Sequence, residues 1–164
     1  MSNTPKFIVV IGTSAGRLKA LVKPISQFQA DFLAPVLVVQ HISADATGNA
    51  TLDVLNNNSK FKCTHAVHGT NPLPGHLYLA PSDNHLMLDK DCKILVTKGA
   101  QENRSRPAID PLFRSAAVVF GNRVIGIILT GYQDDGTAGM EVIKRCDGTY
   151  IVQDPADGDY PAMP

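Results

Sequence analysis

The stretch that decides the fold is Lys6–Gly16, which reads Lys-Phe-Ile-Val-Val-Ile-Gly-Thr-Ser-Ala-Gly. Its first part, Lys6–Ile11, is an apolar run rich in Val and Ile, which predicts a strand buried on both faces. The five residues that follow predict a tight turn. Apolar residues then recur at helical spacing over Arg17–Phe28, with Pro24 expected to kink or split that helix. The stretch therefore predicts a strand–turn–helix unit.

The same alternation recurs further along the chain. Beyond the first unit we predict these elements: a strand at Pro35–Val39, a short helix from its N-cap Thr51 to Leu55, a helix at Asp110–Phe120 with Asp110 as N-cap, a strand at Arg123–Leu129, a helix at Gly136–Arg145 and a strand at Thr149–Val152. The middle of the chain predicts only short strands between turn residues: Thr64–Val67, His76–Ala80, His85–Leu88 and Lys93–Thr97. The sequence thus predicts an α/β fold, a mostly parallel doubly wound sheet with a small antiparallel β-hairpin insert.

Length and composition limit the number of domains and the classes of function that the chain can have. A chain of 164 residues predicts a single domain. Fifteen Lys and Arg balance fifteen Asp and Glu, which argues against nucleic acid as the main partner. The sequence has no apolar run of membrane-spanning length, its N-terminus lacks the layout of a signal peptide, and its three cysteines are scattered. We expect a cytoplasmic protein without membrane insertion.

The turn after the first strand, Gly12-Thr13-Ser14-Ala15-Gly16, has the G-x-S-x-G spacing of a nucleophile elbow. A sharp strand-to-helix turn exposes the serine hydroxyl, and the helix N-terminus brings N–H groups to a developing oxyanion. The competing interpretation is a turn that binds phosphate at a helix N-terminus. The glycine patterns of dinucleotide and Walker sites are missing from the sequence, which favours Ser14 as a nucleophile.

A serine nucleophile needs a base and an acid that orients the base. Five histidines compete for the first role: His41, His65, His68, His76 and His85. Only His41 ends a predicted buried strand. Asp134 and Asp135 follow another such strand, although a residue there can also be just a helix N-cap. The histidines and cysteines lack the spacing of a metal motif, so no metal is expected.

Several collinear segments carry a resemblance that spans almost the whole chain. They are Ile11–Gly16, Val38–His41, Tyr78–Leu86, the segment Arg106–Ala117 (similar to R-P-S-x-D-x-L-F-R-S-x-A), the segment Leu129–Gly136 (similar to L-T-G-M-G-x-D-G) and the tail from Gln153 to Pro164. Together they resemble the catalytic domain of the chemotaxis protein-glutamate methylesterases (CheB type). The resemblance implies a serine esterase that hydrolyses glutamate γ-methyl esters, and deamidates glutamine, on the cytoplasmic helices of chemoreceptors.

The resemblance also implies roles for single residues. The catalytic triad would be Ser14, His41 and Asp135, and main-chain N–H groups of Ala15, Gly16 and Tyr132 would hold the oxyanion. No cofactor is implied. The sequence departs from the family pattern at four positions: Ala15 for Thr, Arg17 for Gly, Tyr132 for Met and Gln133 for Gly.

The expected organisation is one CheB-like methylesterase catalytic domain over residues 1–164, truncated at its C-terminus and without a receiver domain. The expected partners are a methyl-accepting chemoreceptor or similar signalling protein, and a receiver or methyltransferase domain in the same or another chain. Two other hypotheses remain open at this stage. One is a non-catalytic or weakly active docking module within a larger signalling protein, and the other is an α/β domain that binds an anion or nucleotide.

Overall fold

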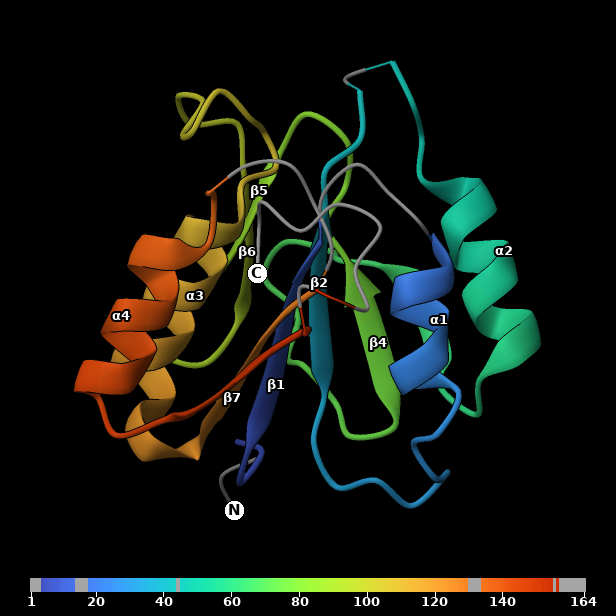
Figure 1. The fold of residues 1–164 in the computed structure, drawn as a ribbon, viewed down its shortest axis with the longest axis horizontal. Coiled ribbons are helices and arrows are strands. Elements are labelled where there is room, and N and C mark those ends of the chain that lie inside the picture. Colours follow the sequence, from blue (N-terminus) through green and yellow to red (C-terminus); the bar gives the residue numbers. More distant parts are fainter. Residues whose placement is uncertain (1–3, 14–17, 44, 130–133, 155, 157–164) are drawn as a thin grey trace.

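A six-stranded sheet forms the centre of the molecule in the computed structural model, which describes residues 4–13, 18–43, 45–129, 134–154 and 156 (Figure 1). Every neighbouring pair of strands in this sheet is parallel, in the order β3-β4-β2-β1-β7-β8. The strands are β1 (Ile8–Thr13), β2 (Val36–Gln40), β3 (Lys62–His65), β4 (His76–Leu79), β7 (Val124–Ile128) and β8 (Thr149–Val152). The central strands β1 and β2 are buried along their whole length, as their apolar sequences predict.

Helices cover both faces of the sheet (Figure 1). One face carries α1 (Leu18–Ile25) and α2 (Asn49–Asn58), and the other carries α3 (Ile109–Phe120) and α4 (Thr137–Arg145), with a 3₁₀ turn, η1 (Gly121–Arg123), between α3 and β7. Alternate side chains of β1 therefore enter different cores. Val9 packs in the core that includes Leu21 of α1, whereas Val10 packs in the core that includes Phe113 of α3.

A separate antiparallel hairpin consists of β5 (His85–Leu88) and β6 (Ile94–Thr97). The main-chain N–H of Leu88 donates a hydrogen bond of 3.1 Å to the Ser115 hydroxyl, which ties β5 to α3. The predicted α/β class, the parallel sheet and the hairpin insert are thus confirmed.

Several predicted element boundaries are wrong. The apolar pattern extends to Phe28, but α1 ends at Ile25, directly after Pro24, which agrees with the interruption expected at this proline. Helix α2 is longer than predicted, and its N-cap is Gly48. Thr51 is therefore not a cap. It lies within α2 and donates its hydroxyl hydrogen to Oε1 of Gln40 at 2.9 Å.

The sheet changes its direction of winding beside β1. The helix after β1 lies on one face, while α4, which follows the neighbouring strand β7, lies on the opposite face (Figure 1). In doubly wound folds, ligands bind beyond the carboxyl ends of the strands at such a switch point. The fold therefore directs attention to the segments that follow β1, β2 and β7. Among the described residues, no helix is both long and apolar enough to cross a membrane.

Gly12 near the end of β1 lets α3 approach the sheet closely at this point. A Cβ on Gly12 would lie only 2.5 Å from Cγ2 of Ile109, the first residue of α3. Because both residues are buried, neither Ile109 nor the strand has room to move aside. The missing side chain of Gly12 thus sets where the N-terminus of α3 lies relative to the carboxyl end of β1.

We predict that Gly12→Ala lowers the free energy of unfolding by about 1–3 kcal/mol, the usual range for an overpacked core. Urea unfolding checks this value. Gly99→Ala is the matched control, because its Cβ would meet no atom closer than 3.9 Å. Equal stability losses in the two variants would contradict the close approach at Gly12.

Candidate active site

The carboxyl ends of three adjacent strands meet at the switch point. The main-chain N–H of His41, the residue after β2, donates to the carbonyl oxygen of Thr13 at 2.9 Å. On the other side of β1, the N–H of Leu129 donates to the carbonyl oxygen of Gly12 at 2.9 Å. Thr13 immediately precedes Ser14 in the chain. The backbone of His41 is therefore bonded to the backbone that leads into the predicted nucleophile segment.

The side chain of His41 contacts a buried carboxylate. Its Nε2 lies 2.7 Å from Oδ2 of Asp135, and Asp135 is only 1% exposed. The neighbouring Asp134 is exposed. Of the two adjacent aspartates that the sequence offered, the structure thus brings Asp135 to the imidazole.

Asp135 is held by three further donors. Its Oδ2 accepts the main-chain N–H of Ile109 at 2.7 Å, and its Oδ1 accepts the N–H of Asp110 at 3.1 Å and Nδ2 of Asn103 at 2.7 Å. The first two donors are N–H groups of the first turn of α3, which have no partner within their own helix. The carboxylate therefore caps α3 while it contacts His41.

These contacts set the protonation state of Asp135. Burial favours the neutral acid, but hydrogen bonds from His41, Ile109, Asn103 and Asp110 outweigh it and hold the pKa of Asp135 below its ordinary value. The group at neutral pH is thus a carboxylate, which only accepts hydrogen bonds. Nε2 of His41 must then carry a hydrogen, and in the neutral ring Nδ1 has the lone pair that can accept a proton.

The helix caps differ from those predicted. The N-cap of α3 is Ala108, not Asp110, and it has no side chain able to cap. The Asp110 carboxylate instead accepts the N–H groups of Gly136 at 3.1 Å and Gly139 at 2.7 Å, at the start of α4. Asp135, which precedes α4, caps α3 in return. The two helices thus exchange capping carboxylates.

Asn103 was not predicted from the sequence as a site residue. It lies in the loop between β6 and α3, and its Nδ2 donates to both Asp110 and Asp135 at 2.7 Å. An asparagine in a polar loop gives no sequence signal of such a role, because asparagine is common in turns.

The other four histidines have different partners. His85 is buried, with Nε2 2.8 Å from the carbonyl oxygen of Ala100 and Nδ1 accepting the N–H of Ala108 at 3.3 Å, so it braces the loop that precedes α3. The remaining side-chain contacts are His65 with Asn49, His68 with the Val96 N–H, and His76 with the Pro74 carbonyl. Within the described ranges, His41 is the histidine that contacts a carboxylate.

Several predicted residues lie outside the described part of the chain. These are Ser14, Ala15 and Gly16 of the nucleophile turn, Tyr132 of the oxyanion prediction, and the departures at Arg17 and Gln133. Their roles stay predictions. In the part that is described, no three His, Cys, Asp or Glu side chains gather in a way that could hold a metal ion.

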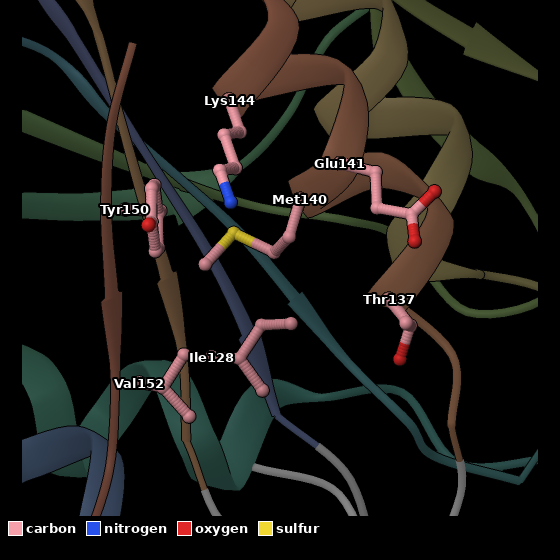
Figure 2. A pocket seen from close by; sticks show the side chains of 7 residues that line it. All are labelled: Ile128, Thr137, Met140, Glu141, Lys144, Tyr150 and Val152. Carbon is pink, nitrogen blue, oxygen red and sulfur yellow. The ribbon is translucent and has the colours of Figure 1, made fainter.

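A pocket lies elsewhere, between α4 and the edge strand β8 (Figure 2). Its volume is about 280 Å³, and its lining consists of Ile128, Thr137, Met140, Glu141, Lys144, Tyr150 and Val152. Neither His41 nor Asp135 lines it, so this pocket is separate from the candidate site.

Comparison with known proteins places the chain in a family. The model of the CheB methylesterases matches residues 9–164. The crystal structure of the Thermotoga maritima CheB methylesterase catalytic domain superposes with a TM-score of 0.90 at 33% identity, covering 96% of this chain and 84% of that one. The chain belongs to the CheB methylesterase family. That family consists of carboxylic ester hydrolases that act in chemotaxis, so the predicted resemblance and enzyme class are confirmed.

Relatives of the CheB methylesterase family differ in length. A relative from Leptospira interrogans is 35% identical over 156 residues, which are 95% of this chain and 80% of the relative. The protein-glutamate methylesterase/protein-glutamine glutaminase of Clostridium acetobutylicum is 39% identical over 143 residues, 87% of this chain but 41% of the relative. The protein of the same name from Ralstonia nicotianae is 39% identical over 168 residues, 99% of this chain and 43% of the relative.

Acid should weaken the contribution of Asp135 to stability. The pKa of Asp135 is lower in the folded protein than in the unfolded chain, so the unfolded chain binds the carboxyl proton more readily. The stabilisation by Asp135 is therefore complete above the unfolded pKa of about 3.9. It is lost as the pH falls through the pKa of the folded protein. We expect Asp135→Asn to cost roughly 2–4 kcal/mol at neutral pH, because it disrupts a buried, charged hydrogen-bond cluster.

That cost should shrink steadily below about pH 4. Urea unfolding of both proteins across this pH range measures it. Asp134→Asn is the control, since Asp134 is exposed and should show only a small loss at every pH. A cost for Asp135→Asn that does not change with pH would show that Asp135 is not held as a carboxylate.

Proposed function

We propose that Ser14, His41 and Asp135 form a catalytic triad that hydrolyses glutamate γ-methyl esters on the cytoplasmic helices of chemoreceptors. The observation that carries the proposal is the 2.7 Å contact between His41 and the buried Asp135 carboxylate, beside the strand end that leads to Ser14. Membership of the CheB methylesterase family and the G-x-S-x-G turn support the same chemistry.

The reaction begins with proton transfer from the serine. Nδ1 of His41 takes the proton of the Ser14 hydroxyl as its oxygen attacks the ester carbonyl carbon. The resulting oxyanion is held by main-chain N–H groups of Ala15, Gly16 and Tyr132. The imidazolium returns the proton to the methoxy oxygen, the C–O bond breaks, and methanol leaves a glutamyl ester on Ser14.

Water completes the cycle by the same route in reverse. His41 takes a proton from water as the water oxygen attacks the glutamyl ester, and then returns it to the Ser14 oxygen. The products are a free glutamate side chain and the regenerated serine. Asp135 stays ionised throughout, because its four donors disfavour its protonation. Its charge stabilises the imidazolium, and its position fixes the ring with Nδ1 as the base.

The same residues can deamidate glutamine. An amide carbonyl would be attacked in the same way, and the proton from His41 would go to a leaving amine, which departs as ammonia. The relatives from Clostridium acetobutylicum and Ralstonia nicotianae carry both activities in their names. A receptor substrate places the protein in the cytoplasm, where a receiver or methyltransferase domain in the same or another chain would be a partner.

Activity tests should separate the triad from its neighbours. We expect Ser14→Ala to abolish methanol release from a methylated chemoreceptor, because the attacking oxygen is lost. Asp135→Asn should reduce kcat by up to about 10⁴-fold, the scale seen when a triad aspartate is replaced. Asp134→Asn should keep nearly the full rate. Substantial methanol release by Ser14→Ala would refute the assignment of the nucleophile.

The rate should also depend on the protonation of the base. The imidazole must be neutral to accept the serine proton, so kcat/KM for an uncharged ester should be low in acid and rise as the pH increases. His41→Gln should remove both the activity and this rise. A rate that does not fall in acid would exclude histidine as the general base.

A further inference from the structure

One exposed side chain connects the two buried carboxylates of the site. Nδ2 of Asn103 lies 2.7 Å from Oδ2 of Asp110 and 2.7 Å from Oδ1 of Asp135. Asp110 is 4% and Asp135 1% exposed, whereas Asn103 is exposed. The amide nitrogen has two N–H bonds, which is enough to donate one to each carboxylate.

The other donors to these carboxylates belong to the two helix ends. Asp135 receives the N–H groups of Ile109 and Asp110 together with His41, and Asp110 receives the N–H groups of Gly136 and Gly139. Within the described part of the chain, Asn103 is the side chain that bonds to both. The two side chains therefore share one neutral donor.

We propose that Asn103 is a positioning residue for the catalytic histidine. It holds Asp135 in place against Asp110, so that the Asp135 oxygen facing His41 keeps the imidazole in its productive orientation. The predicted effect of Asn103 on the rate rests on the proposed function, because Asn103 would act on the Asp135 of the proposed triad. It adds a fourth residue, which acts through Asp135.

The conformation of Asn103 fits this role. Its φ is 51°, in the left-handed region where asparagine is better tolerated than most other residues. Only a side chain that is short and carries two N–H donors on one nitrogen can reach both carboxylates from this backbone position. A serine hydroxyl offers one hydrogen, and a lysine would bring a charge on a flexible stem.

Two titratable side chains lie beside the Asp135 carboxylate: His41, which contacts it directly, and Asp110, which shares the Asn103 donor with it. The hydrogen bond from Asn103 is one of the causes that lower the pKa of Asp135. Removing it should let that pKa rise. The Asp135 carboxylate should also shift, because it would then be held by the N–H groups of α3 and by His41 without a donor from the loop.

The test compares Asn103→Gly with Arg104→Gly in the full 164-residue chain. Glycine accepts the left-handed backbone and removes the amide. Arg104 follows Asn103 directly, is exposed and has a φ of 61°, so its replacement imposes the same backbone change on the same loop. Asn103→Asp is a second variant, which keeps the shape but substitutes an acceptor for the donor.

Two readouts are needed. The first is a titration of the Asp135 carboxyl by carbon-detected NMR, which does not depend on activity. The second is kcat and KM for a peptide that carries a glutamate γ-methyl ester. We expect both Asn103 variants to move the Asp135 titration to higher pH. We also expect kcat to fall about 10–100-fold, as for a catalytic group displaced by about 1 Å, with KM nearly unchanged.

Arg104→Gly should match the unaltered protein in both readouts. The proposal is overturned if the Asp135 titration is the same in Asn103→Gly as in Arg104→Gly, or if the two variants lose kcat equally. A titration that moves while kcat stays also overturns the positioning role. If the unaltered protein hydrolyses no ester, the proposed function fails, while the titration still decides whether Asn103 bridges the carboxylates.

Discussion

The buried carboxylate of Asp135 is the group on which the site and the packing of two helices both depend. A charge that is 1% exposed is tolerable only when hydrogen bonds replace its lost hydration, and Asp135 has donors from α3, from Asn103 and from His41. Three of these donors hold the carboxylate in place, and the fourth is the imidazole. The histidine is thus oriented by a group that the fold itself has already fixed.

The exchange of caps between α3 and α4 explains how the fold supplies this group. Each helix begins with N–H groups that need an acceptor, and each receives it from an aspartate at the start of the other. Close approach makes the exchange possible. A Cβ on Gly139 would lie 2.5 Å from Cβ of Phe113, and one on Gly12 would meet Ile109 at the same distance. Missing side chains at these glycines bring both helix ends to the carboxyl end of β1.

The sequence predicts the strands and helices of this arrangement better than the side-chain contacts between them. The Val- and Ile-rich runs at β1 and β2 are recognisable because both faces of each strand are buried. The helices predicted at Asp110–Phe120 and Gly136–Arg145 are present as α3 and α4, with starts that differ by one residue. The predicted cap at Asp110 is wrong because a capping rule is local, whereas the carboxylate finds its partners on another helix. Asn103 could not be predicted, because its role exists only once β6, α3 and α4 are assembled. The choice of Asp135 over Asp134 came from the family pattern, since no local property of the sequence separates them.

The central claim is that Asp135 orients His41 to activate Ser14. The most direct measurement is the rate at which a fluorophosphonate labels the protein, with the labelled residue located by peptide mass spectrometry. We expect covalent labelling of Ser14 in the unaltered chain and the same rate in Asp134→Asn. In His41→Gln and Asp135→Asn, labelling should be slower by orders of magnitude. Labelling at another residue, or an Asp135→Asn protein that reacts as fast as the unaltered one, would contradict it.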